Sequence, residues 1–528
     1  MRPRLPFFER AWRRSPLDFA LGVAALAVAA YAVIAPFLAS RYPAMTDFPF
    51  HAAGAATLRH YRDPSYHFQE QFHLRPVAVP YLSMYAVGAA LMLFLPPVTA
   101  AKIAGALMIA LVPAGLAVLF HGLKKSPLLG LLGFGVAWCD LTHWGFLNSM
   151  GALGLFAAAI GFTARLVDRP TRGRQLALAT TLVALYFTHI FRFPFALAAV
   201  IGTAVVMYPA TGRLRPVVVP MLPALALLAL WLRIRPAALT SGVGPLGVHL
   251  ERFRELFAAV SGAFVDGSDR LAASVFFLVV GAVAILSAAA GRHRARLLGR
   301  RSLAWSVGAL IIPASCSLVF LMLFLMLPMW IGAWWYVYPR ESVSLALLLL
   351  GLAPDLPRSP ALRVPLTAAL GLAVLGVGRT VVRNYAVFDA STADFAAIIE
   401  QIPRAPRLLY LVFDHEGSTR IASPFMHLPA YVQAEKGGWL SFHFAIFGAS
   451  PLQYRARGEP GAVVPPPMPS RFEWEPSTFE AGKHAPFFDW FLVRRVDSPD
   501  ALFRIDPAIE RVDHVGTWWL YRRRPASR

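Results

Sequence analysis

The segment Thr46-Asp47-Phe48-Pro49-Phe50-His51 has the residue types of an acid–base site. It follows an apolar run, and a carboxylate at the mouth of an apolar bundle is costly to desolvate, which raises its pKa toward that of a working general base. His51 stands four residues after Asp47, one helical turn away if a helix begins at Pro49. Alternatively, Asp47 only caps that helix and His51 is an interfacial side chain. Asp47 and His51 are therefore the candidate catalytic residues.

Other polar residues lie between apolar runs and suggest an anion-binding role. An arginine beside a Trp- and Tyr-rich stretch can hold a lipid phosphate, although cations near span ends also reach toward lipid headgroups. Asp140 lies in a short turn with His143; together with Asp47 it could ligate a divalent cation, or it could simply cap the hairpin. The candidate substrate- or phosphate-binding residues are Arg340, Arg192, Arg75, Asp140 and His143.

The composition shows which elements must position these residues. Of the 528 residues, 57% are hydrophobic and 15% are charged, and the mean hydropathy is +0.55. A soluble domain averages about 45–50% apolar and about 25% charged residues, so the chain is predicted to be a polytopic membrane protein. Two cysteines without CxxC spacing predict neither a disulfide framework nor a zinc site. The apolar runs are 17–40, 77–95, 99–120, 127–139, 150–164, 176–188, 194–208, 217–232, 271–290, 303–327, 342–353 and 364–382.

The net charge of +21 belongs to the membrane part, because residues 384–528 hold equal numbers of basic and acidic side chains. The basic amino end predicts a first span with its amino terminus in the cytoplasm. If every later run crossed, the basic loops at Lys124 and at 165–174 would lie outside, against the positive-inside rule. We therefore interpret 77–95, which ends at Pro96-Pro97, as a juxtamembrane segment. About eleven spans remain, and the carboxyl domain then lies outside.

The expected organisation is a polytopic α-helical membrane domain over 1–383, including an outer loop at 41–98, followed by an extracytoplasmic α/β domain over 384–528. Within the second domain, 392–402 has helical spacing, and 408–413, 487–493 and 517–521 are predicted strands. The cations are dispersed over short loops, so no nucleic-acid partner is expected.

This pattern resembles the C-type glycosyltransferase (GT-C) superfamily, which includes lipid A aminoarabinose transferases and protein O-mannosyltransferases, and is most similar to its bacterial members. The resemblance rests on the first span, the acidic DFPFH motif at 47–51, the juxtamembrane segment, the many further spans and the outer carboxyl domain. A second acidic position in the family matches Asp140. Oligosaccharyltransferases have paired acidic residues there, so a metal cofactor is left open, with Asp47 and Asp140 as its ligands if one binds.

The resemblance implies an inverting hexosyl- or pentosyltransferase that moves a sugar from a polyprenyl-phosphate carrier to an envelope glycan, lipid or protein acceptor. Asp47 would act as general base or orient the acceptor. The implied location is the bacterial inner (plasma) membrane, among phospholipids, with transfer at the outer face. Two other classes stay open: a lipid or polysaccharide transporter or flippase, and a non-catalytic scaffold of envelope assembly.

Overall fold

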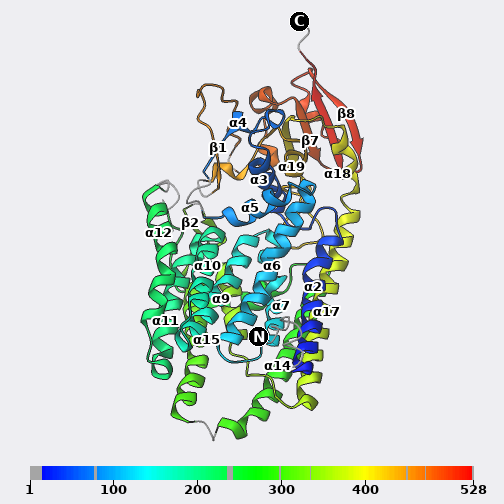
Figure 1. Cartoon of the computed structure of the whole chain (residues 1–528). Helices are drawn as coiled ribbons and strands as arrows, with labels where there is room; N and C mark the ends of the chain where they lie inside the picture. Colours follow the sequence, from blue (N-terminus) through cyan, green and yellow to red (C-terminus); the bar gives the residue numbers. More distant parts are fainter. Residues whose placement is uncertain are drawn as a thin grey trace, which may run out of the picture.

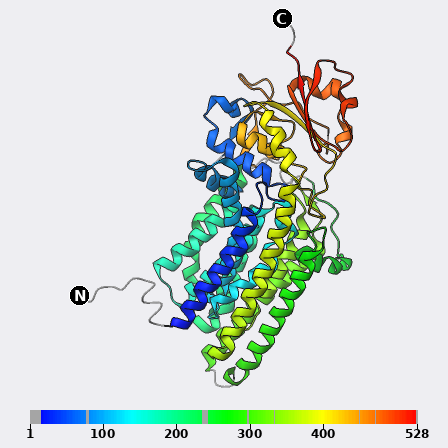
Figure 2. The same cartoon turned by 90° about the vertical axis from the view of Figure 1, so that its right-hand side faces the viewer.

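The computed structural model describes residues 15–75, 80–234, 242–295, 299–332, 334–447, 450–469 and 471–525. A bundle of long helices forms one part, and an α/β cap covers one end of it (Figure 1). The view turned by 90° shows the cap at one end of the bundle, with the carboxyl-terminal end of the chain on the side of the cap away from the bundle (Figure 2). The predicted membrane bundle with a carboxyl-terminal α/β part is confirmed.

Eight helical segments of the described chain are long and apolar enough to cross a membrane. The three remaining predicted spans, at 127–139, 176–188 and 342–353, correspond to shorter helices. The long helices are α2 (Pro16–Leu38), α6 (Pro97–Gly122), α9 (Leu147–Asp168), α11 (Phe193–Thr211, extended by η3, Ile190–Arg192), α12 (Val218–Ile234, with η4, Arg215–Val217), α14 (Ser268–Ala295), α15 (Arg300–Met326) and α17 (Pro360–Ala390); the shorter ones are η2 (Pro127–Gly133) with α7 (Phe134–Ala137), α10 (Arg172–Thr188) and α16 (Val337–Leu350).

The predicted juxtamembrane segment 77–95 contains the short helix α5 (Leu82–Leu91). Ten residues rise about 15 Å, half the thickness of a hydrocarbon core, so α5 is too short to cross. It lies at the level where the bundle meets the cap (Figure 1). Residues 76–79 lie outside the described residues.

Helices α6 and α9 pack with their backbones in close contact. A Cβ on Gly115 would lie 1.9 Å from the carbonyl oxygen of Gly154, and one on Gly122 would lie 2.4 Å from that of Gly161. Both pairs are spaced by seven residues, two helical turns, so they form a continuous seam. Small residues at such a seam allow the dispersion contacts that hold helices together in lipid.

The basic loops that the charge pattern places on one side meet at the end of the bundle away from the cap. Their side chains join neighbouring loops, so this end is held by cations that donate to carbonyl, carboxylate or hydroxyl oxygens. The contacts join Lys125 to Ala353, Arg363 to Ser126 and Asp18, Lys124 to Asp168, Arg213 to Asp168, and Arg301 to Ala210.

The cap is built on a five-stranded mixed sheet in the order β5-β4-β7-β9-β8. The interior strand β4 is almost fully buried and runs parallel to its neighbours β5 and β7, as expected for an apolar run covered on both faces. The strands predicted in this region are all present, and the helix predicted at 392–402 appears as α18 followed by η7. The elements are α18 (Ala393–Ile398), η7 (Ile399–Gln401), β4 (Arg407–Val412), α19 (Ala430–Lys436), β5 (Trp439–Leu440), η8 (Phe444–Ile446), β6 (Leu452–Tyr454), η9 (Pro476–Thr478), α20 (Ala481–His484), η10 (Ala485–Phe487), β7 (Trp490–Arg494), η11 (Asp500–Phe503), β8 (Ile509–Val515) and β9 (Trp518–Arg523).

The loop predicted to lie outside, at 41–98, forms part of the cap. Its strand β1 pairs antiparallel with β6, and the Gln71 side-chain amide donates to the carbonyl of Gly438 at 3.0 Å. Helix α3 packs against α19. The loop elements are α3 (Phe48–His60), η1 (Pro64–Tyr66), α4 (Phe68–Gln71) and β1 (Phe72–Leu74). Segments nearly 400 residues apart therefore make one body.

A second loop joins the cap from the middle of the chain. The segment that precedes α14 makes an isolated bridge between Phe264 and Thr419, and it includes η6 (Leu250–Glu255) and α13 (Leu256–Val260). Helix α17 has 31 residues and spans about 46 Å, well beyond a hydrocarbon core, so its last turns rise into the cap. The domain boundary proposed at Asn384 lies inside this helix.

Candidate active site

The motif at 46–51 docks against a tight turn that follows α8 (Asp140–Trp144). The amide of Thr46 donates to the carbonyl of His143, and the amide of Asp47 donates to that of Trp144, both at 3.0 Å. Gly145 ends α8 in the left-handed region at φ +90°, where glycine is favoured, and a Cβ there would lie 2.9 Å from the Asp47 backbone nitrogen. The two acidic segments predicted for the site are thus in direct contact.

The His51 side chain stabilises this contact. Its Nε2 lies 3.0 Å from the carbonyl oxygen of Gly145, and its Nδ1 lies 3.0 Å from the Tyr85 hydroxyl. Burial lowers the pKa of His51 to about 4, so the ring is neutral, with Nε2–H donating to Gly145 and Nδ1 accepting from Tyr85. Both ring nitrogens are occupied, and this arrangement suits a residue that positions the turn beside Asp47.

The Asp47 carboxylate stands at the first turn of α3 but does not cap it, because its side chain accepts no hydrogen bond there. The side chain is only 16% exposed. Burial raises the pKa of Asp47 from 3.8 to about 7, and the positive charge of Arg340 opposes that rise. A carboxyl group with this pKa takes up and releases a proton near neutral pH.

His427, from the cap, faces Asp47. Its Nε2 lies 3.8 Å from Asp47 Oδ1, and the side chain is almost fully buried. The ring stacks on Phe442 with an interplanar angle of 12° and lies 4.8 Å from the Phe50 ring. Burial lowers the pKa of His427 to about 3, which keeps it neutral beside the carboxyl group. The cap thus supplies one wall of the site.

Asp140 occupies the opposite side of the turn. Its Oδ2 accepts a hydrogen bond from the Tyr336 hydroxyl at 2.7 Å, while its buried Oδ1 has no partner among the described residues. Burial raises the pKa of Asp140 to about 6. His143 is fully buried and contacts the Tyr385 hydroxyl at 3.4 Å through Nδ1; burial lowers its pKa to about 4.

Arg340 lies at the start of α16, in an aromatic setting. Its guanidinium donates to the carbonyls of Tyr336 and Trp335, lies 3.1 Å from His189 Nε2, and packs 4.3 Å from the centroid of the Phe146 ring. The side chain keeps partial exposure. No carboxylate pairs with it in the described part of the chain, so its charge is available to an anion.

The other two predicted arginines have different surroundings. Arg192 is 1% exposed and donates to the carboxylate of Glu341, which is fully buried, so its charge is already balanced. Arg75 is exposed at the end of β1, where its backbone amide donates to the carbonyl of Pro451. Neither is joined to Asp47 by a contact in the described structure.

The described residues contain no group of three or more His, Cys, Asp or Glu side chains arranged to hold a metal ion. Asp47 and Asp140 have separate partners, His427 and Tyr336. The possible metal site therefore lacks a third ligand in the part of the chain described. The arrangement suits proton transfer by a carboxylate and charge neutralisation by an arginine.

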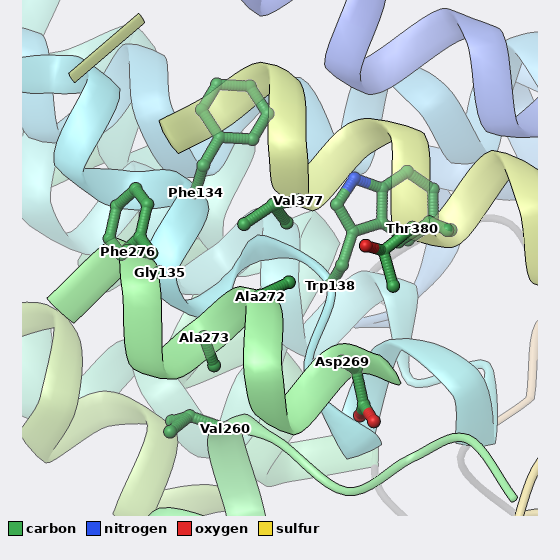
Figure 3. Close-up of a pocket in the computed structure, with 11 residues that line it drawn as sticks. Phe134, Gly135, Trp138, Val260, Asp269, Ala272, Ala273, Phe276, Val377 and Thr380 are labelled. Atoms are coloured by element: carbon green, nitrogen blue, oxygen red, sulfur yellow. The ribbon is translucent and has the colours of Figure 1, made fainter. Parts of the chain in front are cut away.

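A small cleft lies between α7, α14 and α17 (Figure 3). Its lining is mostly apolar, with Trp138 and Phe276 on opposite sides and Asp269 at one end. Asp269 accepts hydrogen bonds from the amides of Gly262 and Ala263. The cleft has a volume of about 20 Å³, room for about one water molecule.

Sequence reasoning overlooked two aromatic residues that shape the site. Tyr81 and Tyr336 both have positive φ values, +94° and +60°, which are unusual for residues with bulky side chains. Trp334 Nε1 donates to the Tyr81 hydroxyl at 2.7 Å, and the Tyr81 ring packs edge-on against His189. Backbone strain of this kind persists where the surroundings hold it, often at functional sites. The density of Trp and Tyr in 330–338 was the available signal.

Comparison with solved structures identifies the architecture. The chain aligns with the crystal structure of ArnT from Cupriavidus metallidurans bound to undecaprenyl phosphate, with a TM-score of 0.54 and 14% identity over 94% of this chain and 97% of ArnT. The chain has the ArnT fold. The predicted architecture, a bundle of membrane helices followed by a carboxyl-terminal α/β part, agrees with this fold.

A second structure, the mycobacterial arabinofuranosyltransferase AftD, gives a TM-score of 0.45 at 15% identity, over 95% of this chain and 41% of AftD. No protein-family model and no curated protein matches the sequence.

Proposed function

We propose that the chain is an integral membrane glycosyltransferase that moves a hexosyl or pentosyl group from a polyprenyl-phosphate carrier to an acceptor hydroxyl at the outer face of the membrane. The observation that carries the proposal is the buried Asp47 carboxyl group, with a pKa of about 7, in the electrostatic field of Arg340 at the end of an ArnT-like bundle. The undecaprenyl phosphate bound to ArnT supports a donor of this class.

In this mechanism Asp47 accepts the proton of the acceptor hydroxyl as its oxygen attacks the anomeric carbon. The bond between that carbon and the phosphate oxygen breaks on the opposite side, so the configuration inverts. The polyprenyl phosphate leaves with the bonding electron pair, and Arg340 balances the charge that grows on it. His427 Nε2 lies 3.8 Å from Asp47 Oδ1 and covers that side of the carboxyl group, so we assign Oδ2 to the acceptor.

The remaining predicted residues position this pair. His51 fixes Gly145 beside Asp47, and Asp140 holds Tyr336, whose carbonyl accepts from Arg340. We place Arg192, with its buried partner Glu341, in support of the helix that carries Arg340. Arg75 and His143 stay candidates for contacts to the acceptor and for support of the turn.

The proposed location is the bacterial inner membrane. The basic end of the bundle would face the cytoplasm, in agreement with the positive-inside rule, and the cap would lie outside. Donor and acceptor would then meet at the outer face, between the bundle and the cap.

The test is the Asp47→Asn substitution in purified protein reconstituted in nanodiscs. The substrates are the polyprenyl-linked sugars and glycan acceptors extracted from membranes of the organism that encodes the chain. Release of polyprenyl phosphate should fall by about 10²–10⁴-fold, because the general base is lost. Binding of undecaprenyl phosphate should be retained. Asp63→Asn, an exposed substitution in the same loop, is the matched control and should keep its rate.

Unchanged turnover in the Asp47→Asn variant would contradict the proposed chemistry. A transporter would move lipid-linked sugar across vesicles without releasing polyprenyl phosphate. A scaffold would keep its cellular phenotype without the carboxylate. Each of these results would replace the transferase with the corresponding alternative.

A further inference from the structure

The cap contains a second cleft, separate from the residues around Asp47. It has a volume of about 360 Å³, within the range of small-ligand pockets. Its lining combines three basic or neutral nitrogen side chains, Arg457, Lys483 and His484, with an apolar wall of Val464, two prolines and Phe487. Among the described residues, no carboxylate lines it. The cleft therefore offers hydrogen-bond donors and positive charge on one side and carbon surface on the other.

Two of the three donor side chains, Arg457 and His484, are held in place before any ligand arrives. Arg457 Nη2 donates to the carbonyl of Pro465 at 2.7 Å, which orients the guanidinium. His484 is 5% exposed, and its Nδ1 accepts from the Glu480 amide at 3.0 Å, so the ring proton is on Nε2. Lys483 is exposed at the rim. Preorganised donors lower the entropic cost of binding.

The turn that carries Arg457 is itself anchored. Arg455 pairs with Glu459 at 2.9 Å and donates to the carbonyl of Gln69 at 3.1 Å, and His73 contacts Glu459 at 2.9 Å. The carboxylate of Glu459 is thereby committed to partners outside the cleft. Trp439 Nε1 donates to Val463 at 2.9 Å and ties down the apolar wall.

We propose that this cleft binds an acidic sugar unit of the acceptor, one that carries a carboxylate or a phosphate. A pyranose ring presents apolar C–H faces that suit the Phe487 and proline surface, and its hydroxyls accept hydrogen bonds from histidine and lysine. Arginine binds a carboxylate or phosphate through its planar set of donors. All lining residues belong to the cap, which lies beyond the helix ends (Figure 2), so the ligand is a saccharide and not a membrane headgroup.

The assignment to the acceptor rests on the proposed transferase function, whereas the binding of an acidic sugar does not. The experiment is therefore a binding measurement on the full chain in nanodiscs, without a donor, by saturation-transfer NMR and titration. The probes are glucuronate and glucose 6-phosphate, with glucose, acetate and inorganic phosphate as comparison ligands. The two acidic sugars also show whether the carboxylate or the phosphate form is preferred.

At least one acidic sugar should bind at least tenfold more tightly than glucose and than the free anions. The double variant Arg457→Ala/Lys483→Ala should weaken that binding at least tenfold, and Lys483→Arg should largely retain it. Arg504→Ala, an exposed arginine elsewhere in the cap, is the matched control and should bind like the parent. Equal binding of glucose, equal binding of a free anion, or full binding by the double variant would overturn the proposal.

The two proposals fail separately. In the Asp47→Asn background acidic-sugar binding should be unchanged, because Asp47 does not line the cleft. If Asp47→Asn keeps its turnover while the cleft binds acidic sugars, the transferase chemistry fails and the saccharide site stands. If turnover depends on Asp47 and the cleft binds no acidic sugar, only the site in the cap is lost.

Discussion

Replacing Asp47 by asparagine should make the folded protein more stable at high pH while removing its activity. The pKa of Asp47 is raised in the folded state to about 7 from 3.8, so the folded protein holds this proton more tightly than the unfolded chain. Its contribution to the free energy of unfolding is complete below about pH 4 and is lost as the pH rises through 7. Asparagine does not ionise and carries no such cost.

The magnitude follows from the pKa difference. One pKa unit corresponds to about 1.4 kcal/mol, so ionising Asp47 at pH 8 costs the folded state up to about 4 kcal/mol. The Asp47→Asn variant should therefore gain up to about 4 kcal/mol relative to the parent between pH 4 and pH 8. In the parent, kcat/KM should fall about tenfold for each pH unit below 7, because only the carboxylate is a base.

The measurement is equilibrium unfolding in mixed micelles, followed by tryptophan fluorescence at several pH values. Asp63→Asn is the control, and its stability change with pH should have the opposite sign. Asp63 is exposed, and hydrogen bonds from Ser65 lower its pKa. This variant should therefore lose more stability at pH 8 than at low pH. A stability difference for Asp47→Asn that does not change with pH would refute the buried, proton-binding carboxyl group on which the mechanism depends.

Three further substitutions probe the geometry. Gly145→Ala should cut turnover at least tenfold with the fold retained, because the new Cβ would press on the backbone of Asp47. The control is Gly212→Ala, at φ +68° with nothing within 4 Å, which should cost stability of about 1–2 kcal/mol but no activity. Equal turnover rates in the two variants would count against the reasoning. Arg340→Gln should lower kcat/KM about 10–100-fold. It should also move the acidic limb of the pH–rate profile to higher pH, because the charge of Arg340 lowers the pKa of Asp47. An unchanged limb would show that the Arg340 charge does not act on Asp47. His427→Phe should preserve the aromatic stack and reduce kcat about tenfold, measured with undecaprenyl phosphate binding as the folding control.

Much of the membrane architecture could be predicted because hydropathy and charge are properties of local segments. The interpretation of 77–95 as a juxtamembrane segment came from loop charge and from its Pro96-Pro97 end, and the helix within it, α5, has ten residues. The three shorter helices lie at predicted spans of 12–13 apolar residues, and the sequence could not fix their lengths, since a run of that size fits a short buried helix as well as part of a span.

The candidate site was predictable only in part. Asp47, Asp140 and Arg340 stood out because polar residues beside apolar runs are costly, and the structure brings their segments around one turn. His427 carries no such local signal, because it lies 380 positions after Asp47 and its role depends on how the cap packs. The contact that His51 makes likewise depends on the position of the Gly145 backbone carbonyl, which no residue pattern reveals.

The pairing of β1 with β6 sets an order of events during biosynthesis. The segment around Asp47 leaves the ribosome early, yet its strand partner and His427 are made only near the end of the chain. Contacts of such high sequence separation form late and slowly in folding. The nascent protein can therefore occupy the membrane well before Asp47 meets His427, and a translation product that stops short of the cap would lack the wall that His427 forms beside Asp47.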